Sequence, residues 1–160
     1  MVNIVGFLNE HIIIMDKTTH YQKLEKMYLK ANINTDLYDS TTVSIKEGYS
    51  EVGLTISKNY FHALGAIHGS VYFKLLDDAA FWAVNSIVHD VFCLTTSFSI
   101  HITKPVSSGK ILAKGILKFK SKQIFFAKSS LFNENGDEIA FGTGSFCKSK
   151  ILLDPSIGYI

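Results

Sequence analysis

Two adjacent aspartates, Asp77 and Asp78, lie in the middle of the most apolar stretch of the chain, residues 67–84. Helical spacing places Asp77 between Phe73 and Phe81, four residues away on either side, so its ionised form would lose solvation. A poorly hydrated carboxylate in a sheltered cleft is typical of a general base or a nucleophile. The alternative is a structural acid that is held by backbone donors or by a contact between subunits.

Asp78 has a different environment in the same helical pattern. Lys74 lies four residues before it and Asn85 seven residues after it, which forms a polar stripe that offers a counter-charge and water. Lys74 is also three residues from Asp77 and can reach either acid. The pattern favours Asp77 as the reactive acid and Asp78 as an ordinary one.

A segment with the sequence GAIHGS, in which Gly65 and Gly69 bracket His68, comes directly before the apolar stretch. Glycine permits close approach of a ligand, and the N–H groups at a helix N-terminus can stabilise a developing oxyanion. A plain helix cap is the alternative explanation. The spacing of His62 and His68 fits no familiar metal site, so we expect neither a metal nor a cofactor.

The hydrophobic pattern indicates which elements hold these residues. Residues 19–31 have helical spacing, and residues 41–57 alternate as two strands with a turn at Glu47-Gly48. The apolar helix is predicted to begin near Ser70, which can cap it, and to continue to about Val88. Four strand-like segments follow, at residues 92–103, 110–119, 123–132 and 138–148.

The four later segments suggest an antiparallel meander, with a strong hairpin signal at Asn135-Gly136. Simple alternation in residues 92–103 places Phe98 and Ile100 on a buried face and Thr95, with Ser97, on a wetter one. The GTG at residues 142–144 is predicted to be a place where backbones crowd in a strand. Because a helix that is apolar all round must be enclosed, we expect an α+β fold whose sheet wraps around it.

The length of 160 residues fits one domain. We expect an N-terminal extension and short helix at 1–40, the main domain at 41–150 and a tail at 151–160. A further hypothesis is that residues 1–14 form an upstream extension, because Met15 precedes a better-organised segment.

Charge and cysteine content restrict the partners and the location. A net charge of +2 with scattered lysines gives no basic face for nucleic acid. Lys74, Asp77 and Asp78 at the centre of the most apolar run argue against a membrane span. Cys93 and Cys147 lie in apolar runs, and no secretory signal is evident, so we expect a cytoplasmic protein with buried thiols.

The order His68-Gly69, followed eight residues after the glycine by Asp77 in LLDDAAFWAVNS, resembles a family motif. It is similar to that of hotdog-fold acyl-CoA thioesterases of the phenylacetate-degradation (PaaI-like) type, which usually read HGG followed by LxDxA. The resemblance covers about residues 40–148 and includes Asn85-Ser86 and Lys104-Pro105. It implies a hotdog fold, in which an antiparallel sheet wraps around a long central helix.

The resemblance implies four catalytic residues. Asp77 would be the catalytic carboxylate, either as general base or as nucleophile, and the backbone N–H of Gly69 would be the oxyanion donor. His62 stands where the family has an amide side chain, and a neutral imidazole can also donate one hydrogen bond. Thr95 would position water. The implied substrate-binding residues are His68, which orders the loop, Ser70, which replaces the second glycine of HGG, and Thr96, one residue from Thr95.

The activity that the resemblance implies is hydrolysis of an acyl-CoA thioester to a free acid and CoA, with CoA as part of the substrate. It also implies a homodimer or homotetramer in which each active site is built from two chains. The alternative is a non-catalytic hotdog protein that binds acyl-CoA or a lipid-like ligand, with turnover lost through His62 or Ser70. A dehydratase of the same fold is disfavoured, because no histidine lies on the central helix.

Overall fold

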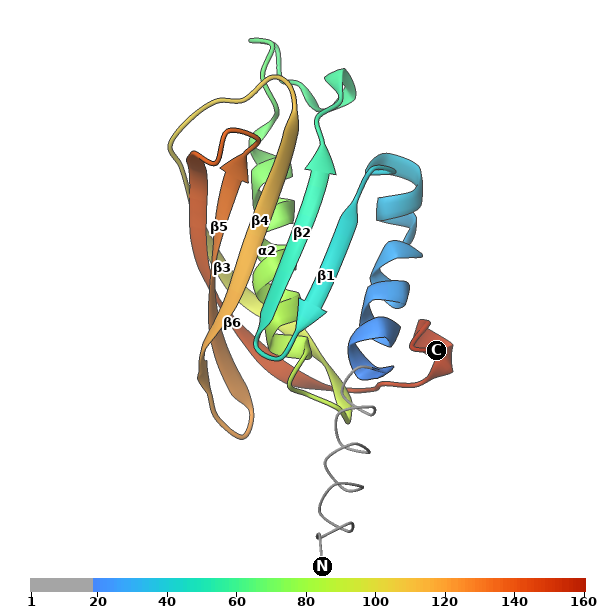
Figure 1. Cartoon of the computed structure of the whole chain (residues 1–160). Coiled ribbons are helices and arrows are strands. Elements are labelled where there is room, and N and C mark those ends of the chain that lie inside the picture. The colour runs from blue at the N-terminus through green and yellow to red at the C-terminus, as the bar shows by residue number, and fades with distance from the viewer. Residues whose placement is uncertain (1–18) are drawn as a thin grey trace, which may run out of the picture.

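The computed structural model describes residues 19–160 (Figure 1). The hypothetical extension at residues 1–14 lies outside the described residues. In chain order the elements are a helix over 19–29, η1 (Ile33–Leu37), β1 (Thr42–Lys46), β2 (Tyr49–Thr55), η2 (Lys58–Tyr60), α2 (Gly69–Asn85), β3 (Val91–Ile102), β4 (Lys110–Lys120), β5 (Ile124–Asn133), β6 (Glu138–Leu152) and η3 (Pro155–Ile157). None of the helices within 19–160 is long and apolar enough to cross a membrane.

The six strands form one antiparallel sheet in the order β1-β2-β4-β5-β6-β3. It curves around α2, which lies against its inner face (Figure 1). Strands β4, β5 and β6 form the predicted meander. Strand β3 directly follows the helix, but it does not pair with β4, the next strand in the chain. It pairs with β6 instead and forms the edge of the sheet. The predicted α+β hotdog fold is confirmed.

The helix and the sheet are held at close range by their small residues. Ala79 is fully buried, and an added Cβ at Gly115 would lie 2.0 Å from its carbonyl oxygen. Two sheet hydroxyls donate to helix carbonyls, Ser50 to Ala79 at 2.6 Å and Ser129 to Leu76 at 2.7 Å. These contacts fix the orientation of α2 about its own axis. They therefore determine which of its side chains point into the sheet and which point away from the strands that it packs against.

Several local predictions are confirmed and two are corrected. Gly48 and Gly136 have positive φ angles in the predicted turns. The GTG segment lies in β6, where a Cβ at Gly142 or Gly144 would collide with Phe98 of β3. Helix α2 is capped by His68 and not by Ser70. It ends at Asn85, before the predicted Val88, and the next residues turn with i→i−3 bonds, from the Ile87 N–H to the Val84 carbonyl at 3.2 Å and from the Val88 N–H to the Asn85 carbonyl at 3.1 Å.

The two ends of the described chain pack together beside the C-terminal end of α2 (Figure 1). The buried His20 ring makes a hydrogen bond of 2.7 Å to the Tyr159 hydroxyl and one of 3.1 Å to the Asn85 carbonyl. Strand β6 continues to Leu152 before the chain turns into η3. The helix over 19–29 and the C-terminal segment therefore cover a part of α2 that the sheet leaves open.

Candidate active site

Asp77 lies near the middle of α2, on the side that faces β3. Its carboxylate is half-buried, and the Thr95 hydroxyl donates to it at 3.1 Å from Oδ1 and 3.4 Å from Oδ2. Among residues 19–160 no backbone N–H and no second side chain donates to this carboxylate. The structural alternative of an acid tied to backbone donors therefore has no support within this part of the chain, and the carboxylate keeps free lone pairs for a ligand.

Burial raises the pKa of Asp77 from 3.8 to about 6. The Thr95 hydrogen bond lowers this pKa, because it stabilises the charged form, and the nearby charge of Asp78 raises it. Phe73 and Phe81 lie one turn away on either side along α2, as the helical spacing predicted. Near neutral pH the carboxylate is mostly ionised, and its basicity exceeds that of an ordinary aspartate.

A β-bulge in β3 points Thr95 at the helix. The register of β3 against β6 shifts between Thr95 and Ser97, so one extra residue reverses which face the side chains occupy. Thr95 thus lies on the inner face with Phe98, which packs against the core. The predicted alternation, which placed Thr95 on the wetter face with Ser97, is wrong for this reason.

Thr96 is the extra residue at the bulge. Its hydroxyl bonds to the Ser145 carbonyl at 2.9 Å and lies 2.8 Å from the Ser145 hydroxyl. Both threonine hydroxyls are therefore engaged, but only that of Thr95 reaches the Asp77 carboxylate.

Asp78 faces the helix over residues 19–29. Its carboxylate forms an ion pair of 2.6 Å with Lys74 and accepts a hydrogen bond from the Tyr28 hydroxyl. The predicted lysine partner is confirmed, but the predicted stripe is wrong at Asn85, which is fully buried. Tyr28 was not foreseen as a partner, because it reaches Asp78 only through the packing of two helices. Burial is also the main cause that raises the pKa of Tyr28, which therefore stays a hydroxyl donor.

The start of α2 has one backbone donor without a partner. The Ser70 N–H is taken by His68 Nδ1 at 3.1 Å, and the Val71 N–H donates to the His68 carbonyl at 3.0 Å. Across residues 19–160 nothing accepts from the Gly69 N–H, as expected at the first residue of a helix. The Ser70 hydroxyl lies 2.9 Å from His68 Nδ1. The His68 ring thus caps the helix through Ser70, its expected role in ordering the loop stays a prediction, and the Gly69 N–H is left as a donor that a ligand oxygen can use.

His62 lies in the loop that leads to α2. This loop is closed by a bridge between Phe61 and Ile67 and by the His62 N–H, which donates to the Ala66 carbonyl at 2.9 Å. The ring Nδ1 accepts from the Leu64 N–H at 3.1 Å, so the neutral ring carries its proton on Nε2 and can donate there. No group of three or more potential metal ligands gathers within residues 19–160.

The free N–H and the carboxylate are too far apart to share one small ligand within a single chain. Gly69 and Asp77 are eight residues apart on one helix, which separates them by about 12 Å along its axis at 1.5 Å per residue. An oxyanion donor must lie within about 3 Å of the oxygen that it stabilises. Each chain therefore presents two halves of a possible site and not one complete site.

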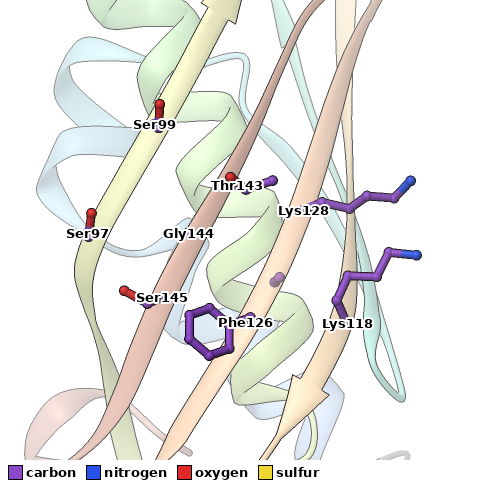
Figure 2. Close-up of a pocket in the computed structure, with 9 residues that line it drawn as sticks. Ser97, Ser99, Lys118, Phe126, Lys128, Thr143, Gly144 and Ser145 are labelled. Atoms are coloured by element: carbon purple, nitrogen blue, oxygen red, sulfur yellow. The ribbon is translucent and has the colours of Figure 1, made fainter.

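A separate groove of about 300 Å³ lies on the outer face of the sheet (Figure 2). It is lined by side chains of four strands, Ser97 and Ser99 of β3, Thr143 and Ser145 of β6, Phe126 and Lys128 of β5, and Lys118 of β4. The sheet separates this groove from α2, so it has no access to Asp77.

Comparisons with known proteins agree with the fold. The model of the thioesterase superfamily matches residues 64–140. A protein of Archaeoglobus fulgidus named "Putative esterase" is 32% identical over 77 residues, which are 48% of this chain and 49% of that protein. The matched segment thus spans about half of that relative's length.

Solved structures give the same picture. The E. coli PaaI protein from the phenylacetic acid degradation operon superimposes with a TM-score of 0.73 at 18% identity, covering 85% of this chain and 97% of that one. A variant of the Thermus thermophilus phenylacetic acid degradation protein PaaI has a TM-score of 0.63 at 19% identity, with 69% and 94% covered. A Haemophilus influenzae thioesterase has a TM-score of 0.67 at 14% identity, with 76% and 85% covered. The chain is thus recognised as a hotdog-fold protein that matches the thioesterase superfamily over residues 64–140, which confirms the resemblance seen in its sequence.

Proposed function

We propose that the protein is a thioester hydrolase that cleaves acyl-CoA to a free acid and CoA. The observation that carries this proposal is the Asp77 carboxylate, half-buried, raised in pKa to about 6 and hydrogen-bonded by Thr95. The Gly69 N–H at the start of the same helix, which has no acceptor among residues 19–160, supplies the second requirement of acyl transfer, a donor for the oxyanion. The superfamily match to residues 64–140 supports thioester chemistry on this fold.

In the first route Asp77 acts as a general base. It takes a proton from a water that the Thr95 hydroxyl helps to position, and the resulting hydroxide attacks the thioester carbonyl carbon. The Gly69 N–H and His62 Nε2–H stabilise the oxyanion. The carbon–sulfur bond then breaks, and the protonated Asp77 returns its proton to the leaving CoA thiolate.

In the second route the Asp77 carboxylate attacks the carbonyl carbon directly. The CoA thiolate leaves, and a mixed anhydride forms between Asp77 and the acyl group. Water then hydrolyses this anhydride and restores the carboxylate. A pKa near 6 suits both routes, because the group is ionised at neutral pH and remains an effective base or nucleophile.

The proposed site requires two copies of the chain. The separation of about 12 Å between Gly69 and Asp77 along α2 means that the oxyanion donor must come from a second copy. Strand β3 offers the place for that contact, because it is a twelve-residue edge strand that carries Thr95 and has exposed apolar side chains at Leu94 and Ile102. An unpaired edge of this length is a natural surface for strand pairing. We therefore propose a homodimer, and a homotetramer stays a prediction.

The adjacent acids provide a matched pair of variants. A panel of acyl-CoA thioesters with thiol release as readout tests turnover. We expect Asp77→Asn to lower kcat by about two to four orders of magnitude while an unreactive acyl-CoA thioether still binds. Asp78→Asn, with the same chemical change one residue away, is expected to keep kcat within about threefold, because Asp78 faces Lys74 and Tyr28.

Two results would contradict the proposal. If Asp78→Asn lost activity and Asp77→Asn kept it, the assignment of the reactive acid would be wrong. If no thioester were hydrolysed although thioethers bound, the protein would be the non-catalytic ligand binder. The cytoplasmic location expected from the cysteines stays a prediction.

A further inference from the structure

An exposed aromatic side chain lies midway between the two halves of the proposed site. Gly69, Phe73 and Asp77 follow one another at intervals of four residues on α2, so they form a row along one side of the helix. Phe73 is 42% exposed. When α2 of a second copy lies antiparallel beside this row, Gly69 of each chain lies opposite Asp77 of the other, and the two Phe73 side chains meet on the two-fold axis.

The edge strand β3 runs antiparallel to this row. Three contacts show which positions of the two elements are level: Gly69 with Ile102, at 3.6 Å from an added Cβ, Phe73 with Phe98, at 5.8 Å between ring centroids, and Asp77 with Thr95, at 3.1 Å from the hydroxyl. Ile102 thus marks the position of the oxyanion donor on β3, and Thr95 marks that of the carboxylate.

These two marks determine how β3 can pair with a copy of itself. Opposite residues of an antiparallel pair lie on the same face of the sheet, so a shift of one residue is forbidden. Because the β-bulge makes Thr96 an extra residue, three steps of the pairing lead from Thr95 to Ser99, and three more lead to Ile102. A two-fold axis at Ser99 therefore places Thr95 opposite Ile102 of the partner subunit.

We propose that two copies of the chain pair through β3 in this register, with the two-fold axis passing Ser99 on the strand and Phe73 on the helix. The proposal rests on the proposed thioesterase function, because this register completes that site. Ile102 of the partner subunit then forms a wall of the site beside Thr95 and Asp77. The pairing also covers Phe73 and Ile102, which is 46% exposed in the single chain. The next allowed registers displace the partner by two residues, about 7 Å, and separate the two halves again.

Cysteine cross-linking measures the register without turnover. Ser97, Ser99 and His101 are exposed and lie outside the proposed site. Opposite residues of an antiparallel pair have Cα atoms about 4.5–5.5 Å apart, which is within the range of a disulfide. Oxidised Ser99→Cys should therefore run as a covalent dimer on a non-reducing gel. All variants carry Cys147→Ser, which leaves the buried Cys93 as the native thiol, and this background protein is the control.

Two flanking positions test the same register independently. Ser97 lies opposite His101 of the partner subunit when the axis is at Ser99. Ser97→Cys and His101→Cys should each stay monomeric on the gel when oxidised alone, and they should cross-link after the two variants are denatured and refolded together.

A register shifted by two residues gives a different pattern. Cross-linking of Ser99→Cys only when it is mixed with Ser97→Cys, or only when it is mixed with His101→Cys, would overturn the proposal even in an active enzyme. The absence of a cross-link from every pair would overturn it as well. Cross-linking by Ser99→Cys alone, in a protein that hydrolyses no thioester, would support the register and refute the proposed function.

The activity of the cross-linked dimer shows whether the linked register is the active one. The disulfide at Ser99 lies at the axis and away from Asp77, so hydrolysis should stay within about twofold of that of the reduced form. A loss of activity on oxidation that a reductant restores would overturn the proposal.

A charge on the axis should separate the two copies. Phe73→Glu brings two carboxylates to one point, so size-exclusion chromatography should show a monomer with an unchanged far-ultraviolet circular dichroism spectrum. Phe119→Glu, the same change at a phenylalanine of β4 that is 53% exposed, is the matched control and should remain a dimer. If Phe73→Glu stays as dimeric as this control, Phe73 does not lie on the axis and the proposal is overturned.

Discussion

The proposed two-chain site makes a prediction that depends on a single hydrogen atom, the one on the Gly69 nitrogen. Gly69→Pro deletes this N–H, and the local structure accepts the substitution. Proline is favoured at the first residue of a helix, and the preceding His68 already has the extended angles φ −66° and ψ 149° that proline imposes on its neighbour. An added Cβ at Gly69 meets only Ile102, at 3.6 Å.

We expect Gly69→Pro to lower kcat by about 10²–10³, the usual effect of losing one oxyanion donor. Gly69→Ala is the matched control, since it adds the same Cβ but keeps the N–H. The thermal unfolding midpoints of both variants should remain close to that of the unaltered protein, because the deleted N–H bonds to nothing among the described residues.

Mixing the inactive variants separates a two-chain site from a one-chain site. A heterodimer of Asp77→Asn and Gly69→Pro subunits contains one site with the intact Gly69 of the first subunit and the intact Asp77 of the second. After denaturation and refolding of a one-to-one mixture, about a quarter of the unaltered activity should return, because half of the dimers are mixed and each has one intact site. If the mixture stays as inactive as its components while size-exclusion chromatography shows dimers, the two-chain site is refuted.

Three further outcomes follow from the same geometry. Thr95→Val removes the bond that lowers the Asp77 pKa, so the acid limb of the kcat/KM profile should move from pH about 6 up by about one unit; a pH series with Thr95→Ser as control checks it. The raised pKa of Asp77 corresponds to a destabilisation of the ionised folded state by about 3 kcal/mol, which solvent screening of this partly exposed group reduces to about 1–2 kcal/mol. Asp77→Asn should therefore stabilise the fold by about 1–2 kcal/mol above pH 6. Because the folded pKa is raised, this gain should vanish below about pH 4, as urea unfolding at both pH values would reveal. Gly115→Ala should destabilise by about 3 kcal/mol or prevent folding, because its Cβ would lie 2.0 Å from the Ala79 oxygen; thermal unfolding of the purified variant measures this.

The sequence predicted the elements well because their signals are local. The apolar helix, the turn at Gly48 and the hairpin at Asn135-Gly136 each depend on residues that are close in the chain. The pairing of β3 with β6 did not follow from such signals. Strand order depends on which long connection is made, and the sequence of a strand does not specify its neighbour.

In the candidate site, the surroundings of Asp77 could be predicted from the sequence, but the sheet face on which Thr95 lies could not. Helical spacing separated the aromatic surroundings of Asp77 from the polar ones of Asp78, because an α-helix keeps its period through the whole of residues 69–85, but it left Lys74 within reach of either acid. A strand does not keep its period of two in the same way, because one β-bulge reverses which face of the sheet the following side chains occupy. Period-two alternation therefore placed Thr95 on the wrong face, and only the register shift after Thr95 brings its hydroxyl to the helix.

The different chemistry of the two aspartates comes from what packs on each side of one helix. A step of one residue turns the side chain by about 100°. That rotation takes Asp78 to Lys74 and Tyr28 of the neighbouring helix, where its charge is neutralised. It leaves Asp77 beside the edge strand β3, where one hydroxyl and no cation of residues 19–160 contacts its carboxylate, so that burial raises its pKa. The helix over 19–29 thus contributes to the difference in chemistry between Asp77 and Asp78. Without Tyr28 and the burial of Lys74, the charged surroundings of the two carboxylates would differ much less. Tyr28→Phe should accordingly cost about 1 kcal/mol of stability and leave the acid limb of the activity profile in place, because Asp77 has no contact with Tyr28.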